Sequence, residues 1–207
     1  HDSIGLGEDG PTHQAVEQLT SLRIIPGMSV WRPADVTETA VSWQSSLEKL
    51  NGPSSLILTR QTLPELSRTK TQIKSIKKGG YILRDCKDKI DAILLSSGSE
   101  THLCVEAAEI LKKDGYNVRV VSIPCLEEFL SQSQSYQNKV IPKNIDNILA
   151  VEAGIGVCWD SIIGKKGFKL TMNSFGLSAP GNQVLKYFGF TTTKVVKQTK
   201  KLINKNR

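Results

Sequence analysis

Short apolar runs alternate with amphipathic stretches in the second half of the chain, and this alternation most constrains the fold. The runs at 92–96 and 118–123 have the length of buried strands, and a helical period spans about 98–113 between them. Strands that alternate with helices favour a mostly parallel sheet with helices on both faces. We therefore predict an α/β fold for this half of the chain.

The other elements of this half follow from the same periodicities. The single glycine at Gly98 indicates a tight strand-to-helix turn, because a dinucleotide site needs a richer glycine pattern. In the helix at 98–113 we expect four residues to face inward: Leu103, Ala107, Ile110 and Leu111. We also predict strands at 81–84, 148–151 and 170–172, and helices at 126–130, 136–140, 180–188 and 193–203.

Residues 1–62 have the pattern of the end of a second α/β layer. Gly10 and Pro11 predict the start of a helix that continues to about residue 22, which would place His13 in its first turn. Strands are predicted at 29–31 and 55–59, and the second of these ends at Arg60.

Between these strands, Asp35 is a predicted N-cap for a helix that continues to about residue 50. Glu38 follows three residues later, as in a capping box. The helical period predicts a buried stripe made by Val36, Ala40, Trp43 and Leu47.

Residues 63–78 have the composition of a linker, with scattered cations and no strong apolar period. One interpretation is a basic patch for nucleic acid. A solvated crossover is the better interpretation, because no aromatic residues are interleaved for base stacking. We therefore expect no nucleic-acid partner. The residues after this linker, 79–207, form the second predicted domain.

Composition narrows the function classes without choosing one. The chain has 207 residues, of which 39% are hydrophobic and 23% charged, as in a globular protein with a proper core. No apolar run approaches the ~20 residues needed to cross a bilayer, so we expect no membrane partner. The net charge of +7 favours anionic partners, either nucleic acid or phosphorylated metabolites.

The cysteines indicate a reducing compartment. Cys86, Cys104, Cys125 and Cys158 are widely spaced and form no C-x-x-C pair, so no zinc site is expected. Free, mostly buried thiols predict a cytoplasmic location. The chain opens on His1 rather than methionine, so we expect an upstream segment that would have carried any targeting signal.

The first fourteen residues combine glycines with groups that bind oxygen-rich ligands. Asp9 can accept from a substrate hydroxyl, and His13 can donate to a carbonyl oxygen or move a proton. Arg60 ends a predicted strand, where ligands bind in α/β sheets, and its guanidinium matches a phosphate. His1 offers a second phosphate contact. The plain alternatives are a first-turn surface histidine at His13 and a strand-end ion-pair partner at Arg60.

Several runs of this sequence also carry a family resemblance. They are SIGLGEDGPTHQ at 3–14 with Glu-Gln at 17–18, Trp-Arg-Pro at 31–33, Gly-Pro at 52–53, Leu-Ile-Leu at 56–58 with Arg-Gln at 60–61, Gly-Gly-Tyr at 79–81, Val-Glu-Ala-Gly at 151–154, Ser-Phe-Gly at 174–176 and Ser-Ala-Pro at 178–180. Over essentially its whole length the chain resembles transketolase, a thiamine-diphosphate enzyme. One departure is Ala15, where the family usually has proline, which affects helix rigidity more than chemistry.

The resemblance implies a partial pyrimidine-type domain at 1–62, a linker at 63–78 and a Rossmann-like C-terminal domain at 79–207. It also implies transfer of a two-carbon ketol unit from a ketose phosphate to an aldose phosphate. In that reaction Asp9 would bind the hydroxyl beside the carbonyl, His13 would lie at the reacting oxygens as the catalytic residue, and His1 and Arg60 would bind the phosphate.

The resemblance further implies thiamine diphosphate and magnesium (or calcium) in a homodimer with sites between its subunits. It places the cofactor and metal ligands upstream of His1, so we expect none in this chain and an inactive fragment. Rival thiamine enzymes are dihydroxyacetone synthase and deoxyxylulose-phosphate synthase, and the run at 174–180 favours transketolase over the latter. A rival from another class is a non-catalytic basic binding module.

Overall fold

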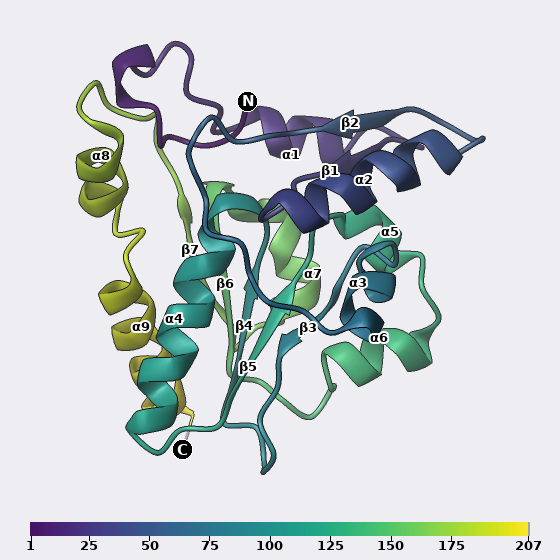
Figure 1. Ribbon diagram of the computed structural model, residues 1–207. Helices are drawn as coiled ribbons and strands as arrows, with labels where there is room; N and C mark the ends of the chain where they lie inside the picture. The colour runs from purple at the N-terminus through teal and green to yellow at the C-terminus, as the bar shows by residue number, and fades with distance from the viewer. Residues whose placement is uncertain (207) are drawn as a thin grey trace.

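A five-stranded sheet forms the centre of the computed structural model, which describes residues 1–206 (Figure 1). Its spatial order is β3-β5-β4-β6-β7. The strands β4, β5, β6 and β7 are parallel, and β3 pairs antiparallel with β5 at one edge. The prediction of a mostly parallel sheet is thus confirmed. The strands are β3 Tyr81–Arg84, β4 Ala92–Ser96, β5 Val118–Ser122, β6 Ile148–Ile155 and β7 Phe168–Met172.

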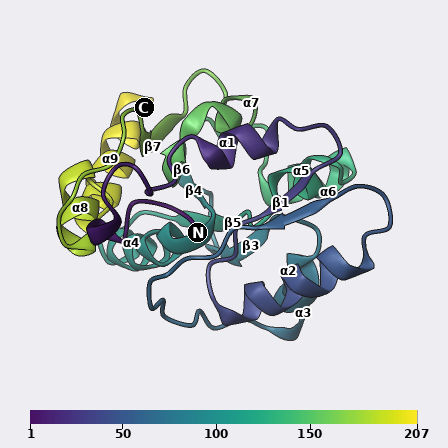
Figure 2. The ribbon, with the colours of Figure 1, turned by 90° about the horizontal axis from the view of Figure 1, so that it is seen from above.

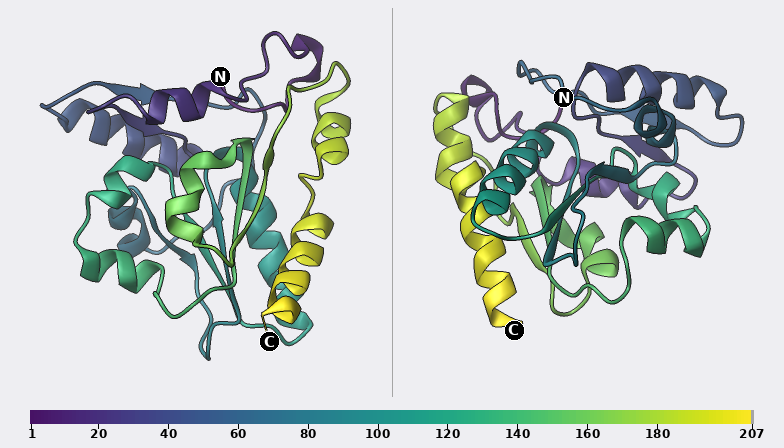
Figure 3. Two further views of the ribbon diagram at one scale, coloured as in Figure 1. Left: turned by 180° about the vertical axis from the view of Figure 1, so that it is seen from behind. Right: turned by 60° about the horizontal axis from the view of Figure 1, so that its bottom comes forward.

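Helices cover both faces of this sheet (Figures 1 and 3). Alternate residues of a strand point to opposite faces, so Leu94 joins the core with α4 and α9, whereas Ile93 and Leu95 join the core with α5, α6 and α7. The helices are α4 Thr101–Lys113, α5 Leu126–Leu130, α6 Gln134–Val140, α7 Asp160–Ile163, α8 Gly181–Phe188 and α9 Thr192–Lys205.

The first part of the chain lies across the carboxyl end of the sheet (Figures 1 and 2). It carries a separate parallel pair of strands, β1 and β2. Arg32 and Gly98 join this part to the end of β4 through the Gly98 N–H, which donates to the Arg32 carbonyl at 2.9 Å. Its elements are a 3₁₀ turn at Gly7–Asp9, α1 Gln18–Arg23, β1 Ser29–Trp31, α2 Val36–Glu48, β2 Ser54–Leu56 and α3 Lys70–Ile76.

The prediction for the first helix is wrong at its start. The helix begins at Gln18, and residues 11–13 form a turn, so His13 does not lie in a first helical turn. The side chain of Gln14 gives the physical reason, because its amide donates to the Leu6 and Leu177 carbonyls at 3.3 and 3.0 Å. These contacts fix the segment in a non-helical path against the second half of the chain.

The predicted buried stripe of α2 is also wrong. Val36, Ala40, Trp43 and Leu47 are all exposed, and Leu47 keeps 77% of its accessible surface. Asp35 does cap the helix, accepting from the Glu38 N–H at 3.0 Å.

Polar partners determine which face of α2 is buried. The Glu38 side chain is fully buried and accepts from the hydroxyls of Tyr81 and Ser122 at 2.7 Å. Arg68 pairs with Asp35 at 2.5 Å and with Glu38 at 3.1 Å. Because these buried charges compensate one another, the helix turns its polar face inward and its apolar stripe outward.

Three smaller differences separate the structure from the sequence predictions. Residues 63–78 contain the helix α3, whose start is set by a capping box between Thr69 and Gln72. In α4, Ile110 is 41% exposed, and Cys104 and Ala108 take inward positions beside Ala107 and Leu111. The second strand of the first part ends at Leu56, not at residue 59.

The cysteines are free thiols, with Cys104 and Cys125 buried and Cys86 and Cys158 half-buried. A search of residues 1–206 finds no helix with the length and apolarity to span a bilayer.

We predict that iodoacetamide modifies native Cys86 and Cys158 at least tenfold faster than Cys104 and Cys125. Burial raises the pKa of Cys104 to about 12 and also raises that of Cys125, so neither thiol forms the reactive thiolate or meets the reagent. Peptide mass spectrometry measures the four rates, and urea-unfolded chain is the control in which all four react. Equal rates at Cys86 and Cys104 in the folded chain would contradict the described core.

Candidate active-site loop and its buried support

The loop at residues 1–17, which we call the substrate loop after the role that the family resemblance implies, lies against the segment that precedes α8 (Figures 1 and 3). Two glycines permit this approach. A Cβ on Gly7 would lie 1.2 Å from the Ala179 carbonyl oxygen, and a Cβ on Gly181 would lie 1.7 Å from the Gly5 carbonyl oxygen. Only glycine fits where two backbones meet this closely, so these positions dock the loop on the second half of the chain.

Three of the predicted site residues come together here: His1 and Asp9 of this loop, and Arg60, which follows β2. Asp9 Oδ2 lies 3.1 Å from His1 Nε2 and 3.0 Å from Arg60 Nη1. The Asp9 side chain is 17% exposed, whereas that of Arg60 is 53% exposed. The Asp9 carboxylate therefore lies between the His1 ring and the half-exposed Arg60 guanidinium, at a solvent-accessible site.

His13 stands apart from this group. Its ring is exposed, and its Nδ1 lies 2.9 Å from the Thr12 hydroxyl. None of the hydrogen bonds or ion pairs described within residues 1–206 joins His13 to His1, Asp9 or Arg60. The structure thus brings together three of the four predicted residues.

Directly beneath the substrate loop, the guanidinium of Arg32 is buried among carboxylates. It lies 2.9 Å from Asp2, 2.8 Å from Glu100 and 3.9 Å from Glu152. It also donates to the Ser97 carbonyl at 2.6 Å. Burial alone would lower the pKa of Arg32, but Glu100, Asp2 and Glu152 outweigh burial and raise it.

A second arginine completes this buried network. Arg23 forms a two-pronged pair with Glu152, at 2.8 and 2.9 Å, and the Trp159 indole N–H donates to the same carboxylate at 2.8 Å. Burial would raise the pKa of Glu152, but the charges of Arg23 and Arg32 outweigh it and lower that pKa. Glu152 is therefore ionised in the folded chain at neutral pH.

Sequence reasoning assigned no role to this network. Arg32 and Glu152 lie in two runs that carry the family resemblance, at 31–33 and 151–154. The available signal was a carboxylate inside an apolar strand, since Glu152 interrupts β6 and is nevertheless fully buried. Its partners are distant in sequence, so their identity needed the structure.

The cavities of the chain do not enclose a substrate at the loop. A cavity lined by His1, Asp2 and Arg32 measures only about 30 Å³, far below the ~300 Å³ at which ligand pockets begin. A search of residues 1–206 for three or more His, Cys, Asp or Glu side chains placed to hold a metal finds none. The cluster of His1, Asp9 and Arg60 is therefore an open surface.

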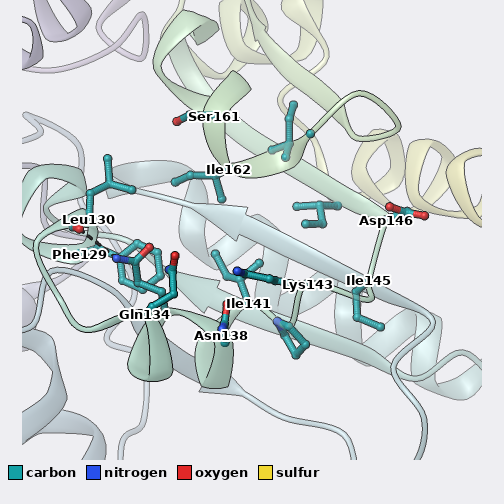
Figure 4. A pocket seen from close by; sticks show the side chains of 15 residues that line it. Phe129, Leu130, Gln134, Asn138, Ile141, Lys143, Ile145, Asp146, Ser161 and Ile162 are labelled. Carbon is teal, nitrogen blue, oxygen red and sulfur yellow. Dashed lines mark hydrogen bonds between the residues drawn. The ribbon is translucent and has the colours of Figure 1, made fainter.

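A larger cavity of about 480 Å³ lies between α5, α6 and α7, away from the substrate loop (Figure 4). Phe129, Ile141 and Ile162 line it with apolar surface, and Asp146 at its rim already pairs with Lys166 at 2.8 Å. None of the predicted site residues lines it.

Known proteins match both halves of this chain. The family model "Transketolase, pyrimidine binding domain" matches residues 1–65, and "Transketolase-like TK C-terminal domain" matches residues 79–191. Transketolase 2 of Escherichia coli strain K12 is 48% identical over 203 residues, which are 98% of this chain and 30% of that protein.

Solved structures give the same result. Transketolase from Pichia stipitis, solved with sedoheptulose 7-phosphate, has a TM-score of 0.91 at 40% identity and covers 99% of this chain and 29% of that one. Transketolase from Leishmania mexicana has a TM-score of 0.91 at 38% identity, with the same coverage. The chain therefore belongs to the transketolase family. It spans about 30% of the length of the curated relatives it matches.

We predict that Glu152→Gln lowers the free energy of unfolding by about 3–5 kcal/mol near pH 7, because it leaves Arg23 and Arg32 short of a buried counter-charge. The pKa of Glu152 is lowered by folding, so its stabilisation is fully present above the ordinary carboxyl value of 4.5 and is lost as pH falls through the folded value. The difference between the two chains should therefore shrink in acid.

Urea unfolding of both chains at several pH values measures this difference. Asp146→Asn, which breaks the exposed pair with Lys166, is the matched control and should cost less than about 1 kcal/mol. A Glu152→Gln effect as small as that of the control, or one that grows in acid, would contradict the network.

Proposed function

We propose that this chain supplies substrate-binding residues to a transketolase that transfers a two-carbon ketol unit from a ketose phosphate to an aldose phosphate. One observation carries the proposal: the convergence of His1, Asp9 and Arg60 at a loop docked on the second half of the chain. A relative solved with a sugar phosphate supports the same substrate class.

The proposed roles follow from exposure and charge. Arg60 is half exposed and pairs only with Asp9 among the ion pairs of residues 1–206, so a substrate phosphate can take over its guanidinium. Asp9, thereby released, accepts from the hydroxyl beside the carbonyl. His1 adds a second contact to the phosphate.

His13 is the proposed catalytic residue. Its ring is exposed and its Nδ1 faces the Thr12 hydroxyl, so its Nε2 is the atom that donates to the reacting oxygen and takes the proton back. Because the described contacts do not join it to His1 or Arg60, we assign His13 to the carbonyl end of the substrate and Arg60 to the phosphate end.

The cofactors of the proposed whole enzyme are thiamine diphosphate and magnesium (or calcium). When bound, the thiazolium ring supplies the electron sink of the reaction. The described residues form no metal site, so they do not fit the cofactor's diphosphate and metal, and we derive no step through these groups. Their ligands are proposed to come from outside this chain.

The organisation we propose is a portion of the pyrimidine-binding domain at 1–62, a linker at 63–78 and a C-terminal domain at 79–207. The two separate sheets and the two matching family models support this division. We also propose a cytoplasmic homodimer, in which the site lies between subunits. Free thiols support the location.

A chimera tests the proposed function. In it, this chain replaces the aligned 203-residue stretch of E. coli transketolase 2. With thiamine diphosphate and magnesium we expect ketol transfer within about tenfold of the parent, with the truncated relative as an inactive control. A folded, cofactor-loaded chimera without transfer would overturn the proposal, and its range of donors separates transketolase from the other thiamine enzymes.

We predict that Arg60→Ala in this chimera raises KM for a phosphorylated acceptor at least tenfold and leaves KM for an unphosphorylated acceptor within about twofold, because the proposed role of the lost guanidinium is to bind the phosphate of the substrate. Steady-state kinetics with both acceptors measures the split. Arg119→Ala is the matched control, since Arg119 also pairs with an aspartate, at 2.9 Å. Equal losses with both acceptors would contradict the role of Arg60.

We predict that Asp9→Ala reduces discrimination between ketose epimers at the hydroxyl beside the carbonyl by at least tenfold, because that hydroxyl then lacks its carboxylate partner. The ratio of kcat/KM for the two epimers measures the effect. Asp91→Ala, outside the substrate loop, serves as the control. An unchanged ratio would make Asp9 structural.

A further inference from the structure

We propose that Asp2 is a positioning residue, through which the C-terminal domain holds the phosphate-binding end of the substrate loop in place. The proposal rests on the proposed function, because that function places a substrate phosphate at His1. It extends that function, since it gives the C-terminal domain a part in substrate binding although none of the four proposed site residues lies in it.

The first step is the contact between Asp2 and Arg32. The Asp2 side chain is nearly fully buried, and its Oδ2 lies 2.9 Å from Arg32 Nη2. Its backbone N–H donates to the Leu58 carbonyl at 3.1 Å, which ties the same residue to the segment that leads to Arg60. His1 directly precedes Asp2 in the chain, so fixing Asp2 at both its backbone and its side chain also limits where His1 can lie.

The second step is the support of Arg32 by the C-terminal domain. Glu100 Oε2 lies 2.8 Å from Arg32 Nη1, and it also accepts from the Ala153 N–H at 2.8 Å. Ser99 Oγ accepts from Arg32 Nη2 at 3.1 Å. The Ala153 N–H of β6 holds Glu100 in place. Glu100 and Ser99 together then fix the orientation of the Arg32 guanidinium toward Asp2.

The backbone at Gly98 leaves room for this guanidinium. A Cβ on Gly98 would lie 2.6 Å from Arg32 Cζ, and its φ of +59° is one that glycine favours. The turn between β4 and α4 therefore accommodates the Arg32 side chain. In dinucleotide-binding proteins a turn at this place binds phosphate instead.

The third step is the connection from His1 to Asp9. His1 Nε2 lies 3.1 Å from Asp9, and Asp9 is the partner of Arg60. A displaced His1 would thus change the whole phosphate-binding end of the loop. Replacing the Asp2 carboxylate by an amide removes one charge and keeps Glu100 and Glu152 on Arg32, so the core is retained.

Hydrogen–deuterium exchange on the 207-residue chain tests the structural part. We expect Asp2→Asn and Ser99→Ala to speed exchange of peptides within residues 3–14 at least tenfold, while peptides of β4 and β6 remain as protected as in the unchanged chain. Asp146→Asn, the same chemical change at an exposed pair, should alter neither. Unchanged exchange in the loop of Asp2→Asn would overturn the proposal whether or not the chimera is active.

Kinetics of the chimera test the functional part. Asp2→Asn should raise KM for a phosphorylated acceptor about tenfold with kcat within about twofold, and leave an unphosphorylated acceptor unaffected. In a His1→Asn background, the same substitution should change KM less than twofold, because Asp2 acts through His1.

Positioning by Asp2 would be overturned if the KM changes caused by Asp2→Asn and by His1→Asn multiplied in the double variant. It would also be overturned if Asp2→Asn impaired both acceptors equally. An unsubstituted chimera without ketol transfer would instead refute the proposed function, and the exchange experiment would then still decide whether the C-terminal domain orders the loop.

Discussion

The buried guanidinium of Arg32 is the interaction on which the docking of the two halves depends. Its carboxylate partners come from the substrate loop, from the turn after β4 and from β6. Removing an ion from water costs several kcal/mol unless its partners are all in place. A structure in which only some of these parts are docked would leave a buried charge uncompensated. The network therefore favours the single arrangement in which the substrate loop and the rest of the first part of the chain are both docked on the five-stranded sheet.

This dependence explains how the first part of the chain is ordered with only a two-stranded sheet of its own. A two-stranded sheet is marginal in water, and β1 and β2 form only that. The Arg32 N–H donates to the Pro124 carbonyl at 2.7 Å, and Trp31 forms a bridge with Cys125. Together with the hydrogen bonds and ion pairs of Glu38, these contacts hold the first part of the chain against the second half. They thereby do what additional strands would do in a larger sheet. The inward polar face of α2 follows from the same requirement.

Sequence periodicity predicted the second half well, because strand and helix periods are local properties, and β4 was predicted to the residue. It failed at α2 and at Ile110, where partners distant in sequence decide which face is buried. It also failed at α1, since Gln14 is held by a carbonyl 163 residues away. The meeting of Asp9 with Arg60 was expected only through the resemblance, and the roles of these residues remain predictions. Spacing gave no sign that Arg32 and Glu152 would meet.

Two arginines of this chain show how environment separates support from binding. Arg60 is half exposed, and an ion pair in such a place contributes about 0–1 kcal/mol, so in the proposed function a substrate phosphate competes with Asp9 for it at little cost. Arg32 is fully buried and faces three carboxylates, so separating it from all of them would leave an uncompensated charge in the core. Under the proposed function, the guanidinium that exchanges partners during turnover is therefore the exposed one. The guanidinium that must keep its partners lies where exchange is too costly, directly under the loop that carries His1 and Asp9.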